Sequence, residues 1–489
     1  MPDSDPSARG AESDASVIEE VRRLIRTKEA SCVDMVKRSL DLIAAGDSRL
    51  NAVVALRAEG ALLEAAEQDR RLSAGEAPGP LAGVPLLVKD LEDVAGMVTT
   101  QGSLVYADTA PASTDGTVPS RLRAAGAIVI GKTNLPECAF EAYTANRLYG
   151  PTRNPWDLRY SPGGSSGGSA AALSAGMVAL ATSTDGGGSA RIPAAFCGLV
   201  GLKPTNGIIG RAPIPSWMDL ATDGSMGQSV ADLRMLLELT AGPTVGDPNA
   251  LPSWSPRPGR VGRVVAAVRT SDWGSLDPDL QAAFDQALRV LESELGLVVE
   301  MVEPAEVTPA GNADVDWYTI CCVEQAHQIG RSVLDERAAD FDPVLLAQMQ
   351  SGLQTSLADY VDARRRRFEH VRYLDLLLGH DGVLVTPTLA MTAQHADGRM
   401  LGADMPGTPE DALNTCLQNL TGHPAVSVPA GMLPNGLPFG LQLTGTRFRD
   451  DLLLDLAERW EAARPWPWFA PGFEPLVAQP GGSPAVTTP

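Results

Sequence analysis

The chain has few side chains that can act as a base near neutral pH. Its 489 residues include five histidines, and none of them stands in an H-E-x-x-H or similar spacing, so we expect no metal site. Lysine is equally scarce, because it occurs only at positions 28, 37, 89, 132 and 203 while the 39 basic residues are otherwise arginine. The six cysteines form no C-x-x-C pair, which predicts reduced thiols rather than a disulfide framework.

Long apolar runs and an excess of positive charge are also missing. No segment approaches the roughly 18 to 20 apolar residues that a membrane span needs. The acidic start MPDSDPSARGAESDAS contains no apolar run, so we expect no signal peptide, a cytoplasmic location and a disordered tail at 1–15. The net charge of −21 is spread along the chain, which argues against nucleic acid and membrane surfaces as partners.

The rest of the chain alternates between helical and strand patterns. Ser16 and Glu19 form a capping-box pattern at the start of a first helix, and runs such as GVPLLVK and AIVIGK indicate buried strands. Strands separated by helices predict an α/β fold with a largely parallel sheet. Residues 310–378 are predicted to be mostly helical. No long linker divides the chain, so we expect one domain over 16–489.

Two glycine clusters that carry serine lie close together, GGSSGG at 163–168 and TDGGGSAR at 184–191. A flexible linker does not explain them, because the residues between them form an apolar helical pattern. The first cluster matches the nucleophile-elbow pattern G-x-S-x-G, centred on Ser165 or Ser166. No buried strand precedes it, however, and a histidine base would have to come from an ordinary-looking position such as His423. No Gly-Lys-Ser/Thr follows the glycines, so a phosphate-binding P-loop is excluded.

The second cluster offers successive backbone N–H groups that can converge on one point. This arrangement suits the oxyanion of a tetrahedral intermediate and would make Ser189 a nucleophile, although a tight structural turn explains the spacing equally well. Without a histidine base, a serine hydrolase can use lysine, which loses its proton when desolvated, whereas arginine does not. Lys89, Lys132 and Lys203 each end an apolar run, and at least two of them are expected to be snorkelling or ion-paired.

The region GGSSGGSAAALSAGMVALATSTDGGGSARIPAAFCGLVGLKPT closely resembles the signature stretch of the amidase signature family of serine hydrolases. The resemblance extends to AGVPLLVKD, to LRAAGAIVIGKTNLPECAF and to NLTGHPAVSVPAGMLPNGLPFGLQLTG. It covers about 82–445 and is weakest over about 247–380. It implies the amidase signature fold, an α/β architecture with a mixed, mostly parallel sheet covered by helices on both sides.

The resemblance also implies a Ser-cisSer-Lys triad and no cofactor. Carried over to this chain, Lys89 is the base, Ser165 is the bridging serine after a cis peptide bond, and Ser189 is the nucleophile. The oxyanion hole would consist of backbone N–H groups of Gly186, Gly187, Gly188 and Ser189.

Departures from the family pattern concern the substrate. The family commonly has a bulkier residue at Gly186, a branched one at Ala190, a glycine at Ser183, and a proline and an arginine at Ser225 and Gln228. Missing side chains beside the nucleophile predict a widened acyl pocket. We therefore expect the substrate to be an amide of aryl, peptide or nylon-oligomer type, or a carbamate such as a urethanase hydrolyses, rather than a compact molecule such as malonamate.

The segment DVDWYTICCVEQ is most similar to nylon-oligomer hydrolases. This makes Trp317, Tyr318 and Cys321 candidates for the substrate pocket, while core packing explains them at least as well. The leading hypothesis is that the protein hydrolyses amide or carbamate bonds in small molecules. A homodimer is one assembly in which it could act. The alternatives are the glutaminase component of a tRNA-dependent amidotransferase and a catalytically silent binding protein of the same family.

Overall fold

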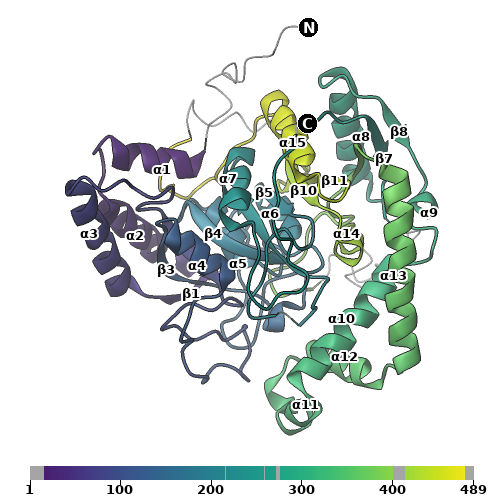
Figure 1. The fold of residues 1–489 in the computed structure, drawn as a ribbon, viewed down its shortest axis with the longest axis horizontal. Coiled ribbons are helices and arrows are strands. Elements are labelled where there is room, and N and C mark those ends of the chain that lie inside the picture. The colour runs from purple at the N-terminus through teal and green to yellow at the C-terminus, as the bar shows by residue number, and fades with distance from the viewer. Residues whose placement is uncertain (1–15, 215, 258, 271–275, 400–412, 480–489) are drawn as a thin grey trace.

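The computed structural model describes residues 16–214, 216–257, 259–270, 276–399 and 413–479. The predicted disordered tail lies outside these residues. An eleven-stranded sheet runs through the molecule in the order β1-β3-β2-β4-β6-β5-β10-β11-β9-β7-β8, with helices packed against it (Figure 1). The strands are β1 (Val53–Leu56), β2 (Pro85–Lys89), β3 (Ile128–Thr133), β4 (Leu180–Asp185), β5 (Val200–Lys203), β6 (Thr222–Gly227), β7 (Arg263–Ala266), β8 (Val299–Met301), β9 (Gly382–Pro387), β10 (Ala425–Met432) and β11 (Pro438–Gly445).

The sheet is mixed, but the prediction that it is mostly parallel was wrong. Strand β2 runs parallel to β3 and β4, and β7 runs parallel to β8 and β9. The other neighbouring pairs are antiparallel. One antiparallel pair arises from a hairpin between β10 and β11. Its short connection contains Asn435 and Gly436, a dipeptide that favours tight β-turns.

Helices fill the connections between most strands. The predicted start of the first helix is confirmed, because the Ser16 hydroxyl oxygen accepts a hydrogen bond from the Glu19 backbone N–H at 3.0 Å. The helices are α1 (Val17–Arg26), α2 (Cys32–Leu50), α3 (Ala58–Ser73), α4 (Thr117–Ala124), α5 (Gly167–Ser174), α6 (Arg191–Cys197), α7 (Val230–Thr240), α8 (Pro278–Ser293), α9 (Pro304–Val307), α10 (Ala313–Ile329), α11 (Arg331–Glu336), α12 (Pro343–Gln354), α13 (Leu357–Leu378), α14 (Cys416–Thr421) and α15 (Asp450–Ala463).

Alternating strand residues supply separate cores on the two faces of the sheet. Leu86 and Val88 of β2 pack with residues of α1, α4, α7 and α15, whereas Leu87 packs with α2, α3 and α5. Successive side chains of a strand point to opposite faces, so helices cover both faces, as predicted. Near the other edge, Val264 and Val265 of β7 divide in the same way.

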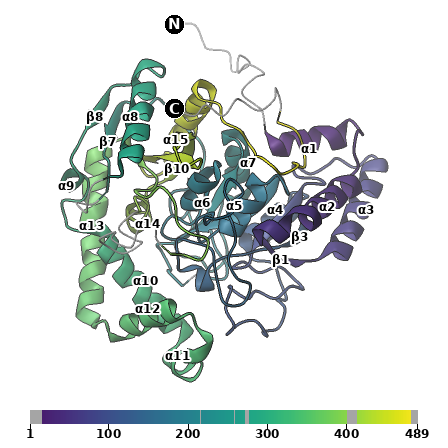
Figure 2. The same cartoon turned by 180° about the vertical axis from the view of Figure 1, so that it is seen from behind.

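The segment predicted to be helical at 310–378 contains α10, α11, α12 and α13. Figures 1 and 2 show these helices together on the side of the molecule away from α1–α3. They pack with α14 and with Val265 and Leu384 of the sheet around a shared apolar cluster. The helical segment therefore covers the part of the sheet that β7 and β9 form. The prediction of a single domain over 16–489 stays a prediction.

Candidate active site

A cavity lies beside the ends of β2 and β4. These strands are parallel, so their carboxyl ends, Lys89 and Asp185, lie at the same edge of the sheet. The lining of the cavity includes Ser165, which precedes α5, and Ser189, which follows β4. The structure thus brings one serine from each glycine cluster to the same cavity.

Lys89 contacts the first of these serines. Its Nζ donates hydrogen bonds to Ser165 Oγ at 2.7 Å and to Thr184 Oγ1 at 2.8 Å. The Gly164–Ser165 peptide bond is cis, as the family resemblance implied. Burial lowers the pKa of Lys89 to about 7, against the opposing effect of nearby carboxylates, of which Glu92 is the largest. The amine is therefore held against Ser165 with a greatly reduced cost of losing its proton.

The other two lysines at strand ends have local partners instead. Lys132 forms a buried ion pair with Asp90 at 2.9 Å. Lys203 Nζ donates to the Pro204 carbonyl and to Asn206 Oδ1, both at 2.8 Å. Of these three lysines, Lys89 is thus the one that meets Ser165. Lys132 is ion-paired, as expected for at least two of them, whereas Lys203 is fully buried and hydrogen-bonded to neutral oxygens.

The loop that carries Ser189 turns around the Asp185 carboxylate. Asp185 is fully buried, pairs with Arg191 at 2.8 Å, and accepts the backbone N–H of Gly188 at 2.9 Å and of Ala190 at 3.2 Å. The prediction that the Gly188 N–H contributes to an oxyanion hole is therefore corrected, because that N–H is already bonded to Asp185. The remaining predicted donors of the loop are the N–H groups of Gly186, Gly187 and Ser189.

The contact between the two serines is looser than the contact with the lysine. Among the described residues, no hydrogen bond links the hydroxyl groups of Ser165 and Ser189, and the backbone N–H of Ser166 donates to the Ser189 carbonyl at 3.2 Å. Ser189 has 8% of its surface exposed, compared with 1% for Ser165. Of the two, the serine of the second cluster is thus the one more open to the cavity.

The widened pocket predicted from Gly186 is wrong. A Cβ atom at this position would lie 2.4 Å from ring carbons of Trp217, so an indole already fills the space that a larger residue would take. The side chains at Ala190, Ser183, Ser225 and Gln228 do not help to widen the cavity either, because none of them is among its lining residues. An absent side chain is compensated here by an aromatic ring from elsewhere in the chain.

The three residues that sequence similarity suggested for the pocket are not in its lining. Cys321 is fully buried in the core that α10 shares with α12 and α13, and Tyr318 packs edge-on against Phe140. Trp317 reaches the loop after β4 from outside the cavity. From the same helix, α10, it is Gln325 and Gln328 that line the cavity. The structure thus agrees with the alternative of core packing for Trp317, Tyr318 and Cys321, and two other residues of the same helix line the cavity.

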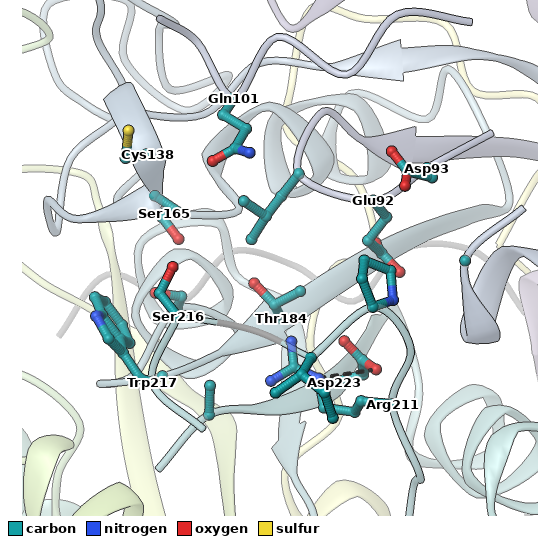
Figure 3. Close-up of a pocket in the computed structure, with 18 of the residues that line it drawn as sticks. Glu92, Asp93, Gln101, Cys138, Ser165, Thr184, Arg211, Ser216, Trp217 and Asp223 are labelled. Carbon is teal, nitrogen blue, oxygen red and sulfur yellow. Dashed lines mark ion pairs between the residues drawn. The ribbon is translucent and has the colours of Figure 1, made fainter. Parts of the chain in front are cut away.

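Charged residues that the sequence did not single out form one end of the cavity. Figure 3 shows Trp217 on one side and Glu92, Asp223 and Arg211 on the other. Arg211 Nε lies 3.4 Å from Asp223 Oδ2. Burial, with Asp223 nearby, raises the pKa of Glu92 to about 8. These groups change the electrostatic environment of Lys89 without contacting it: the carboxylates raise its pKa and Arg211 lowers it.

Comparison with known proteins decides the family. The model of the family described as Amidase matches residues 34–454. The chain belongs to the amidase family. This amidase is 33% identical to an acylamidase of Rhodococcus erythropolis, over 94% of this chain and 98% of that protein. It is 36% identical to a Glutamyl-tRNA(Gln) amidotransferase subunit of Nocardia farcinica, over 91% and 97%.

Solved structures agree with this assignment. A bacterial aryl acylamidase of the amidase signature family superposes with a TM-score of 0.84 at 28% identity, covering 93% of this amidase and 98% of that chain. The 6-aminohexanoate cyclic dimer hydrolase in complex with substrate gives 0.81 at 30% identity, covering 93% and 98%. The protein is an amidase signature hydrolase of carbon–nitrogen bonds. Among the described residues, no helix is long and apolar enough to cross a membrane.

Proposed function

We propose that this amidase cleaves its substrate through an acyl-enzyme on Ser189, with Lys89 as the general base acting through Ser165. The observation that carries the proposal is the 2.7 Å hydrogen bond from Lys89 Nζ to Ser165 Oγ, beside a cavity that both serines line. A nucleophilic hydroxyl needs a neighbouring base, and a lysine serves only when it is neutral.

Proton transfer proceeds from Ser189 to Ser165 and from Ser165 to the neutral Lys89 amine as Ser189 Oγ attacks the amide carbonyl carbon. A lysine pKa of about 7 suits both halves of this reaction, because the amine accepts a proton in the first step and gives it back in the second. When the tetrahedral intermediate collapses, the same relay delivers the proton to the leaving nitrogen.

The negative charge that forms on the carbonyl oxygen is stabilised by backbone N–H groups of Gly186, Gly187 and Ser189. Donors fixed in advance in a cavity shielded from water stabilise such a charge without reorganisation. Water then attacks the acyl-enzyme, with Lys89 and Ser165 removing its proton, and the carboxylic acid is released.

The cavity supports a substrate with a flat apolar part. Trp217, Val118 and Ile214 contribute apolar lining, while Gln101 and Gln325 offer amide groups for hydrogen bonds. We propose an aryl amide as the first substrate class, which is also the class named for one of the most similar structures. Cyclic amides, as named for the 6-aminohexanoate cyclic dimer hydrolase, and carbamates use the same chemistry.

A second candidate function is that of a glutaminase within an amidotransferase complex. It is favoured by the identity of 36% to the amidotransferase protein of Nocardia farcinica. Such a protein would hydrolyse glutamine and pass ammonia to a partner, whereas the first proposal needs no partner. Turnover of glutamine against turnover of an anilide separates the two.

The test is an assay of the purified protein with an anilide, a primary amide, a cyclic amide, an aryl carbamate and glutamine. We expect the wild-type protein to turn over the anilide and Ser189→Ala to lose that turnover. The matched control Ser166→Ala removes a buried hydroxyl next to Ser165 and should keep the turnover. Unchanged turnover in Ser189→Ala contradicts the proposal. Preference for glutamine over every other substrate supports the glutaminase instead.

A further inference from the structure

Three successive carbonyl groups at the end of β4 are held by side chains from distant parts of the chain. Asn419 Nδ2 donates to the Asp185 carbonyl at 2.8 Å. Trp317 Nε1 donates to the Gly186 carbonyl at 2.7 Å, and Thr415 Oγ1 donates to the Gly187 carbonyl at 2.6 Å. This loop leads directly to Ser189.

The bond to Trp317 fixes the orientation of one particular N–H group. The peptide between Gly186 and Gly187 is planar and trans, so its C=O and its N–H point in opposite directions. Pulling the Gly186 carbonyl towards Trp317 turns the Gly187 N–H away from the indole. Trp317 is not among the lining residues of the cavity, whereas Gly186 and Ser189 are. The Gly187 N–H therefore points away from Trp317, in a loop whose residues Gly186 and Ser189 border the cavity while Gly187 itself is not among the lining residues.

The Gly187 N–H is also available for a ligand. Among the described residues it has no hydrogen-bond acceptor, in contrast to the N–H of Gly188, which donates to Asp185 at 2.9 Å. A backbone N–H without a partner in a buried loop is costly. An acceptor atom of a bound substrate at this place would satisfy it.

The indole also prevents the peptide from turning over. A Cβ at Gly187 would lie 2.4 Å from Trp317 Cζ2, so the ring packs directly on this glycine. Trp317 has 5% of its surface exposed and packs edge-on against Trp217, with 5.7 Å between the ring centres. Trp217 covers the preceding residue, Gly186, in the same manner. The two glycines thus lie under two indoles, and the indole of Trp317 is the one that holds a loop carbonyl.

We propose that Trp317 is a positioning residue, which acts through the Gly186 carbonyl to aim the Gly187 N–H at the developing oxyanion. The inference rests on the proposed acyl-enzyme on Ser189. It assigns to the helical segment 313–378 a part in transition-state stabilisation and not in substrate contact. Because an oxyanion donor acts mainly in the transition state, loss of the anchor lowers kcat more than it changes KM.

The test compares Trp317→Phe with Trp460→Phe. Trp460 is a matched control, since its ring is 1% exposed and its Nε1 donates to the Pro429 carbonyl at 2.9 Å, outside the cavity. Removing one oxyanion donor costs about a hundredfold to a thousandfold in kcat, so misdirecting one is expected to cost Trp317→Phe about tenfold to a hundredfold. KM should stay within about threefold, and Trp460→Phe should keep the wild-type kcat.

Two further measurements exclude a merely structural effect. The affinity for a boronic acid, which forms a tetrahedral adduct with a serine, should fall in Trp317→Phe by the same factor as kcat/KM. Benzothienylalanine at position 317 retains the bicyclic ring and has sulfur in place of the N–H, so it should reproduce the loss of kcat with wild-type thermal stability.

A wild-type kcat with benzothienylalanine, or a loss that appears in KM alone, overturns the inference while the proposed function stands. If the wild-type protein neither hydrolyses an amide nor reacts with a fluorophosphonate, the proposed function fails and the inference fails with it.

Discussion

Replacing Lys89 by methionine removes the proposed base while keeping the length of a buried side chain. Lys89 is fully buried and has a pKa lowered from 10.5 to about 7. At pH 7, about half of such lysines are neutral, compared with about one in 3,000 at the ordinary value. General-base catalysis contributes about a hundredfold to ten-thousandfold. We therefore expect kcat/KM of Lys89→Met to fall by at least a hundredfold, mostly through the loss of the acceptor for the Ser189 proton.

The assay is the release of an aniline, measured from about pH 5 to about pH 9. In the wild-type protein, kcat/KM should rise with pH through a midpoint near 7, because the neutral amine is the active form. The residual activity of Lys89→Met should lack this limb. Lys203→Met is the control, since burial also lowers the pKa of Lys203 to about 7 while its Nζ contacts Pro204 and Asn206. Its profile should keep the limb, and thermal unfolding of both variants monitors the fold. A folded Lys89→Met protein with the limb intact would refute the argument.

The lining of the cavity leads to two further predictions. Arg211→Gln removes a positive charge that lowers the pKa of Lys89 and leaves Asp223 unpaired, so the rising limb of the pH–rate profile should move to higher pH. Asp223→Asn removes a negative charge that raises this pKa, so the limb should move to lower pH. Shifts of both variants in the same direction would contradict this. Gly186→Ala should lower kcat/KM for small and large acyl groups alike, because its Cβ meets Trp217. Adding Trp217→Leu should recover activity, with a coupling of about 1 kcal/mol or more in a double-mutant cycle; simple additivity would show that the two positions do not interact.

The helices and the principal strands were predictable from local patterns. Caps such as Ser16 and apolar runs such as the one ending at Lys89 are local signals, and the structure confirms both elements. The pairing direction of the strands was not predictable in the same way. Alternation of helices and strands favours a parallel sheet, but here a sequence-distant strand, β10, inserts antiparallel between β5 and β11.

The candidate site shows the same division between local and distant information. The resemblance named Lys89, Ser165 and Ser189, and the lysine and the first serine are indeed in contact. The space around Gly186 depends on Trp217, and the state of the Gly188 N–H depends on how the loop folds around Asp185. Neither contact has a periodicity or a motif, so a glycine in the sequence indicated empty space where the structure has an indole.

The most direct test of the acyl-enzyme is to find which serine becomes modified. The protein is treated with a fluorophosphonate or with a slowly released aryl ester, digested, and mapped by mass spectrometry, in parallel with Ser189→Ala and Ser165→Ala. The account predicts an adduct on the peptide that contains Ser189, no adduct in Ser189→Ala, and a slower but detectable adduct at the same place in Ser165→Ala. An adduct on Ser165 that persists in Ser189→Ala would contradict it and would make the first glycine cluster the site of the nucleophile.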